Sequence, residues 1–404
     1  MLSGFVGTSM AFTVLFPAIV GTVAPSRLVM IAVGWLFVVV EVARQASHRT
    51  AGLVFGLGSA YLGVVMSIAL VGPNDDPMYA VNGVRLAITL PLYLLVGALL
   101  FNSSHRHIYA RAFVAVAMLA AALAVVEAAT ATSVLGRDYD FARFQREGQA
   151  RALVGSEQVL VFGTLLAGVV PLVRETRWRL AVLPSVILLA GSISSGSRGP
   201  TIIAILVIAL DLVPPVVALI QRRPSLAKWA SVVIVGGVLL ASFVVWTPEV
   251  RGLTGAAYSS AYRAGIYALL PDILNAAPFG IGLGSIPYGV WLLPSELFGV
   301  RDLAATVDSE LVYLAITFGW AGIALFVIAA WISAAGYCAS RTFGLCALVI
   351  TFSGLFVALH AWDSLGPLWY LAVGASVMAV RQKRRGHAPH DVHISRVTAN
   401  RKAA

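Results

Sequence analysis

The chain has 404 residues, of which 59% are hydrophobic and only 11% charged, and its mean hydropathy is +0.88. Soluble globular proteins carry about 25% charged residues, so this composition excludes a soluble globular body, and it also excludes disorder and a disulfide-stapled secreted fold. The net charge is +10, and only three of the 28 basic residues are lysines. A polytopic membrane protein remains, and its arginine excess reflects either a GC-rich genome or a function for arginine.

Long apolar runs predict the membrane spans. A membrane helix needs roughly 20 predominantly apolar residues. In chain order the candidate runs are 5–24, 28–42, 53–71, 84–101, 112–129, 158–173, 180–193, 200–220, 229–246, 311–337, 343–360 and 365–380. The expected fold is therefore all-α, with about 12 transmembrane helices.

The charged residues predict the orientation. With the N-terminus in the cytoplasm, the inner loops and the C-terminal tail hold most of the basic residues, as the positive-inside rule requires. Both termini are then cytoplasmic, and the acidic residues concentrate outside. Two outer segments are long, 130–157 and 247–310, and the second contains an amphipathic, helix-like stretch at 258–275. Long loops of this kind are usually functional or disordered.

We expect the chain to divide into three parts. Residues 1–130 form N-terminal transmembrane helices, and residues 131–380 form a membrane core that includes the outer loop 247–310. Residues 381–404 form a basic cytoplasmic tail, which anionic lipid attracts.

The first candidate site is the turn Ser197-Arg198-Gly199, directly before an apolar span. Ser197 suits the N-cap position and Pro200 suits the first helical turn. A helix N-terminus attracts anions, and an arginine beside it suits a phosphate site. The alternative is an arginine that snorkels from an ordinary turn.

The second candidate lies in the outer loop, where Arg263 and Tyr267 precede a glycine-rich run at 278–284. No strand precedes the glycines and no acidic ribose partner follows them, so a dinucleotide loop is excluded. Close backbone packing, or a chain reversal near a ligand, is the better interpretation of these glycines.

The third candidate is Asp308-Ser309-Glu310, which opens the span 311–337. Carboxylates at a membrane boundary are costly unless they are solvated or paired. They indicate either a general base or an anchor for sugar hydroxyls, although acids at a helix N-terminus are also simply stabilising.

Two weaker candidates complete the set. Arg151 enters the span 158–173 after an arginine-rich loop, and functional and structural roles are equally compatible with it. His360 is the only histidine expected on the outer face, so it offers acid–base chemistry near neutral pH. A single histidine at a helix end is otherwise structural.

These motifs, in this order, resemble the O-antigen ligase and polysaccharide polymerase superfamily of bacterial membrane glycosyltransferases. The resemblance covers roughly residues 151–380, and it rests on the Ser197–Gly199 turn, the Arg263–Tyr267 and glycine pattern, and the segment from Asp308 to Gly322. It implies a GT-C-like fold in the bacterial cytoplasmic membrane. It also implies an inverting, metal-independent enzyme without cofactors, which polymerises or transfers polyprenyl-pyrophosphate-linked glycan at the outer leaflet.

The resemblance also implies roles for individual residues. Arg198 and Arg263 match the paired arginines that hold the donor's pyrophosphate. Arginine suits this role because it binds phosphate oxygens bidentately. Asp308 stands where ligases of the family carry a histidine, which favours the polymerase side and makes Asp308 the preferred base. Glu310 and His360 are the substitute bases, and the residues expected to bind substrate are Ser197, Gly199, Arg151, Tyr267 and Ser309.

The expected partners are the lipid-linked glycan donor, a glycan or lipid-glycan acceptor and membrane lipid, with a chain-length regulator or a flippase as protein candidates. No nucleic acid is expected. The alternative function is a polytopic transporter or lipid-linked glycan flippase, which would use Glu127 and Asp211. A catalytically silent membrane scaffold is the third hypothesis, because the ligase histidine is absent.

Overall fold

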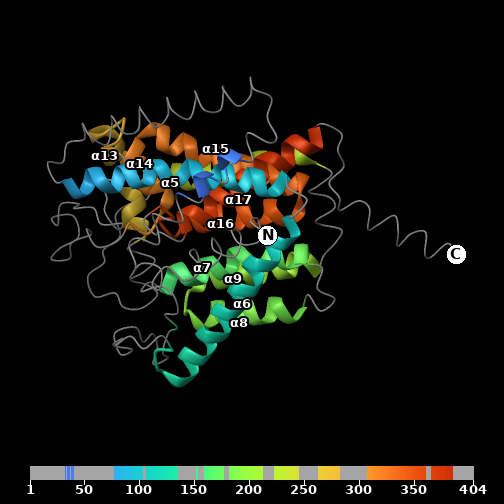
Figure 1. The fold of residues 1–404 in the computed structure, drawn as a ribbon. Helices are drawn as coiled ribbons and strands as arrows, with labels where there is room; N and C mark the ends of the chain where they lie inside the picture. Colours follow the sequence, from blue (N-terminus) through green and yellow to red (C-terminus); the bar gives the residue numbers. More distant parts are fainter. Residues whose placement is uncertain are drawn as a thin grey trace.

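The structure is a computed structural model that describes residues 32, 34–36, 38–40, 77–102, 106–134, 152, 159–176, 182–212, 223–244, 263–282, 307–360 and 365–384. Every regular element in these ranges is a helix (Figure 1). In chain order they are α5 (Pro77–Asn102), α6 (Arg106–Thr130), α7 (Val159–Val169), the 3₁₀ helix η2 (Val170–Thr176), α8 (Val182–Ser194), α9 (Arg198–Leu212), α11 (Pro224–Val244), α13 (Leu270–Ala276), α14 (Glu310–Phe318), α15 (Trp320–Ala339), α16 (Arg341–Ser353) and α17 (Leu365–Arg384).

The all-helical expectation is confirmed for the described residues. Three of their helices are long and apolar enough to cross a membrane, namely Arg106–Thr130, Pro224–Ala241 and Trp320–Ala339. The first three expected spans lie outside the described residues, apart from a few helical positions between 32 and 40. The chain is thus helical with membrane-compatible segments, and the count of twelve spans stays a prediction.

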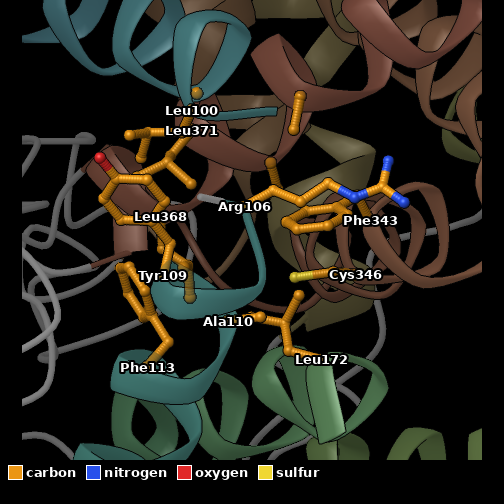
Figure 2. A pocket seen from close by; sticks show the side chains of 13 residues that line it. Leu100, Arg106, Tyr109, Ala110, Phe113, Leu172, Phe343, Cys346, Leu368 and Leu371 are labelled. Carbon is orange, nitrogen blue, oxygen red and sulfur yellow. The ribbon is translucent and has the colours of Figure 1, made fainter. Parts of the chain in front are cut away.

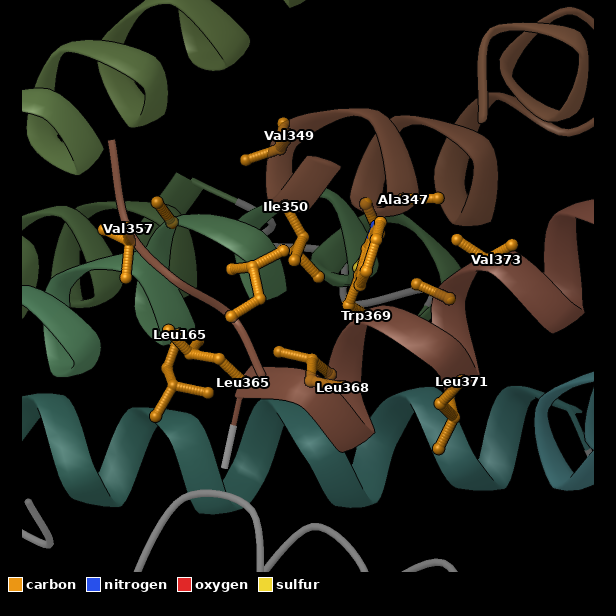
Figure 3. Packing of buried hydrophobic residues seen from close by; sticks show 14 of the residues in the cluster. Leu165, Ala347, Val349, Ile350, Val357, Leu365, Leu368, Trp369, Leu371 and Val373 are labelled. Carbon is orange, nitrogen blue, oxygen red and sulfur yellow. The ribbon is translucent and has the colours of Figure 1, made fainter. Parts of the chain in front are cut away.

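The helices form two groups that α16 joins. In Figure 1, α5 and α13 to α17 lie together on one side, and α6 to α9 lie together on the other. α16 packs against α15 and α17 in the first group and against α7 and η2 in the second. Figure 3 shows this junction, where Leu165, Ile350 and Trp369 belong to one buried apolar cluster. Lipid is as apolar as these side chains, so in a membrane it is their close van der Waals packing that holds the helices together.

The expected single span 311–337 is divided, which corrects the sequence-based prediction. α14 ends at Phe318 and α15 begins at Trp320, because Gly319 adopts a φ of 61° that ends one helix before the next begins. The segment that follows α13 fills this break. Ile281 and Gly282 donate backbone hydrogen bonds to the carbonyls of Ile316 and Thr317, at 2.9 and 3.0 Å.

Glycines allow α5 and α17 to cross with their backbones in close contact. A Cβ atom on Gly97 would overlap the carbonyl oxygen of Leu371, whereas one on Gly236 of α11 would meet nothing within 4 Å. We expect Gly97→Ala to lower the free energy of unfolding by about 1–3 kcal/mol, because backbone cannot move aside as a flexible side chain can.

Gly236→Ala is the matched control for this substitution. Alanine is favoured over glycine inside a helix, so Gly236→Ala should leave stability unchanged or slightly raised. Thermal unfolding of the detergent-solubilised chain measures both variants. Equal unfolding temperatures for Gly97→Ala and Gly236→Ala would show that the backbones of α5 and α17 leave room for a Cβ atom at position 97.

Candidate functional site

The start of α14 collects side chains from three separate segments. Ser309 is the N-cap of α14, and its Oγ accepts a hydrogen bond from the amide of Val312 at 3.4 Å. The hydroxyls of Tyr267 and Ser309 lie 2.8 Å apart, and Tyr267 donates to the carbonyl of Leu355 at 2.7 Å. Tyr267 therefore links three segments: the helical segment 263–268, the N-cap of α14 and the turn after α16.

Arg263 and Asp308 lie beside this tyrosine. Both side chains are half-buried, and the charge of Arg263 acts on Asp308 and on Tyr267. Burial raises the pKa of Asp308 to about 6, and the charge of Arg263 opposes that rise. Burial likewise raises the pKa of the Tyr267 hydroxyl, so this residue stays a neutral hydrogen-bonding group at physiological pH.

The Nε of Arg263 is buried and has no hydrogen-bond partner among the described residues. A buried donor without a partner costs free energy, so such a donor in a native site calls for an explanation. Arginine offers five donors in a fixed fork that fits phosphate oxygens. The geometry at Arg263 therefore suits an anionic ligand beside a carboxyl group that titrates near neutral pH.

Glu310 and His360 form a separate buried pair behind this cluster. Both side chains are fully enclosed, and His360 Nδ1 pairs with a Glu310 carboxylate oxygen, while the His360 amide donates to the other oxygen at 2.9 Å. His360 Nε2 lies 2.9 Å from the Tyr370 hydroxyl, and its ring stacks on Tyr313 with centroids 5.6 Å apart. Because both ring nitrogens have protein partners, His360 joins α14 to α17.

The backbone of Glu310 adds to this joint. Its amide lies 2.6 Å from the carbonyl of Gly354 and 3.1 Å from that of Val357. The first turn of α14 is thus held by backbone and side-chain bonds to the turn after α16. These bonds hold the start of α14 in place, and with it the neighbouring residues Asp308 and Ser309.

The glycine run stands at the other end of α14. Gly280 has a φ of 77°, and a Cβ there or on Gly319 would overlap backbone atoms of the facing segment. The backbone amide of Trp320 donates a hydrogen bond to the carbonyl of Pro278 at 3.0 Å, so the two segments are also hydrogen-bonded to each other. The close-packing interpretation is confirmed for 278–282, whereas residues 283 and 284 lie outside the described residues.

The Ser197–Gly199 turn lies in the other helix group. Arg198 begins α9 and its side chain is exposed, while Ser197 is buried and its carbonyl accepts from the Thr201 amide at 3.2 Å. The turn sits against Gly163 of α7, where a Cβ would lie 2.8 Å from the Cβ of Ser197. Gly199 faces open space. The helix start expected from this motif is present, in a different helix group from Arg263.

Arg151 lies outside the described residues, but the next residue is placed. Ala152 is buried, and its amide donates to the carbonyl of Ser194 at 2.9 Å. The chain therefore passes the end of α8, three residues before the Ser197 turn. Tyr313, Leu355 and Tyr370 also contact the site residues, and no spacing in the sequence predicts these contacts.

Metal-binding residues do not cluster in this part of the chain. Within the ranges that the structure describes, no group of three or more His, Cys, Asp or Glu side chains could hold a metal ion.

Comparisons of the chain with protein-family profiles, with curated proteins and with solved structures find no match.

Proposed function

We propose that the chain is an inverting, metal-independent membrane glycosyltransferase that polymerises or transfers polyprenyl-pyrophosphate-linked glycan at the outer leaflet of the bacterial cytoplasmic membrane. The proposal rests on the buried Nε of Arg263, which has no hydrogen-bond partner among the described residues and lies near a carboxyl group whose pKa is raised to about 6. A cation for the leaving pyrophosphate and a base for the acceptor are the two groups that the reaction needs.

The proposed chemistry follows from these two groups. Asp308, as carboxylate, accepts the proton of an acceptor hydroxyl while the hydroxyl oxygen attacks the anomeric carbon of the donor sugar. The bond from that carbon to the pyrophosphate oxygen breaks on the opposite face, so the configuration inverts. The leaving pyrophosphate takes the electron pair, and Arg263 stabilises its growing negative charge. Among the described residues no ion pair joins Arg263 to Asp308, so the two can face different parts of the substrate.

Other residues have supporting roles in the proposal. Arg198 is the second cation for the donor's phosphates, presented at the start of α9. Tyr267 and Ser309 position Arg263 and Asp308 through their shared hydrogen bond. The carboxyl group at 308, in place of the ligase histidine, favours polymerisation over transfer to a lipid A core.

Reconstitution tests the proposal. The full chain in vesicles, supplied with a polyprenyl-pyrophosphate-linked oligosaccharide, should form new glycosidic bonds and release polyprenyl pyrophosphate. Gel analysis of the glycan and phosphate release are the two measurements. Movement of the donor between leaflets without bond formation would instead support a flippase.

One observation weighs against the transporter alternative. Glu127, which a transporter would use at mid-membrane, lies in the last turn of α6 and accepts a hydrogen bond from the Val134 amide at 3.2 Å. Its carboxylate therefore closes the turn that follows the helix. The side chain of Asp211 lies outside the described residues.

A further inference from the structure

Phe279, in the turn that follows α13, is the most exposed large apolar side chain among the described residues. It is 91% exposed. The fold covers other aromatic rings: Figure 2 shows Tyr109, Phe113 and Phe343 between helices, where each is at most 8% exposed. An aromatic ring is large and apolar, so leaving it in water forgoes a substantial gain from burial. The exposure of Phe279 therefore favours an apolar partner outside the fold.

The turn that carries Phe279 is held firmly. Gly280 has a φ of 77°, and its amide donates to the carbonyl of Ala277 at 2.9 Å. On either side of Phe279, the carbonyl of Pro278 accepts from the amide of Trp320, and the amide of Ile281 donates to the end of α14. The backbone on both sides of the ring is thus fixed against the break between α14 and α15.

An apolar surface continues from this turn along α15. Trp320, the first residue of α15, is 55% exposed. Exposed residues then follow at helical spacing and form one stripe along the helix, namely Trp320, Ala321, Ala324, Leu325 and Ile328. α15 contains no charged residue. Phe279 therefore stands at the end of an outward-facing apolar stripe.

The length and the far end of α15 indicate what covers this stripe. Its 20 residues span about 30 Å, which equals the thickness of the hydrocarbon core of a bilayer. Two lysines lie toward its other end: Lys383 donates to the carbonyl of Cys338 at 2.7 Å, and Lys228 Nζ lies 5.6 Å from the ring centre of Trp331. Aromatic and cationic side chains at the two ends are typical of a helix that crosses lipid.

We propose that the Phe279 turn is a membrane anchor, which inserts the ring beside Trp320 among the phospholipids at the boundary where α15 enters the bilayer. The polar residues of α13 stay in the water above. Because the turn is hydrogen-bonded to the end of α14, its depth also sets the position of the α14 start relative to the lipid. The anchor requires that α15 lies in a membrane, and it does not depend on the proposed reaction.

Spin labelling of the full chain measures the depth of the turn. Cys338 and Cys346 are the only two cysteines of the chain, and both are replaced by alanine before Phe279→Cys is labelled with a nitroxide in phosphatidylcholine nanodiscs. Oxygen concentrates in the acyl region, whereas a nickel chelate stays in water. We expect the ratio of oxygen to nickel accessibility to be several-fold higher at position 279 than at a position in water. Phe279 has few contacts to lose, so the substitution does not threaten folding.

Two labelled positions calibrate this ratio. Asn275→Cys is the matched control, because Asn275 is exposed on α13 four positions away and should report water. Ile328→Cys, in the middle of the stripe, should report the acyl region. Equal nickel accessibility at positions 279 and 275 would place the ring in water, and the anchor would be rejected. Exclusion of both oxygen and nickel from position 279 would mean that protein, such as a second copy of the chain, covers the ring, which also overturns the proposal.

A second measurement uses the wild-type chain. Nanodiscs are doped with a phosphatidylcholine that carries a photoreactive diazirine on its acyl chain, and the adducts are located by mass spectrometry. We expect adducts on residues 278–282 and on the α15 stripe, and none on Asp272 or Asn275. No lipid-linked glycan is present, so the adducts report phospholipid. Adducts on the stripe without any on residues 278–282, or no adducts on either, would each overturn the proposal.

Discussion

Replacing Arg263 with alanine should reduce glycan transfer by roughly 10²–10³-fold, because one fixed donor to the charge that develops in the transition state typically contributes that much. On the proposed function, the buried Nε of Arg263, which has no hydrogen-bond partner among the described residues, is the donor offered to the pyrophosphate. Arg263→Lys keeps the charge but not the two-pronged geometry, so it should recover only part of the rate. Initial rates of polyprenyl pyrophosphate release measure the effect.

Tyr267→Phe is the control for the structural part of this loss. It removes the hydroxyl that links Ser309 to Leu355 but leaves the guanidinium in place. A loss of only several-fold is expected, since a typical net hydrogen bond is worth about 1 kcal/mol. If Tyr267→Phe and Arg263→Ala were equally inactive at equal protein levels, Arg263 would act by holding the segment 263–268 in place, and its role with the pyrophosphate would be rejected.

The positions of most described helices could be predicted from hydropathy alone. The run 112–129 corresponds to α6, which begins six residues earlier, at Arg106. The run 365–380 corresponds to α17, which continues to Arg384. The extension has a simple cause: hydropathy marks the apolar part of a helix, whereas backbone hydrogen bonding continues into the polar flanks. The break at Gly319 was invisible to this method, because the residues on both sides of it are apolar.

The candidate site was predictable as a set of residues but not as an arrangement. Asp308, Ser309 and Glu310 were grouped by their place before an apolar run, yet Asp308 and Glu310 face different surroundings. Ser309 meets Tyr267, which is 42 positions away, and Glu310 meets His360, which is 50 positions away. Such pairings depend on how the turn after α16 folds back on α14. No local spacing contains that information.

Replacing Asp308 with asparagine should lower the transfer rate by roughly 10²–10⁴-fold, which is the usual contribution of a general base. The same site predicts a pH dependence. Burial raises the pKa of Asp308 to about 6, and only the carboxylate can accept a proton, so the wild-type rate should fall as pH drops through about 6 and level off above it. The residual rate of Asp308→Asn should lack this acidic limb.

Arg263 and Asp308 can be tested together through the pH at which the transfer rate falls on the acidic side of the profile. The charge of Arg263 lowers the pKa of Asp308, so its removal in Arg263→Ala should move the limb of the residual activity to higher pH. Asp272→Asn, at an exposed position on α13, makes the same chemical change outside the site and should leave the rate and the pH profile unchanged. A wild-type profile flat from pH 5 to 8, or an Asp308→Asn variant that keeps the limb, would exclude Asp308 as the base. The base would then have to be another residue of the chain.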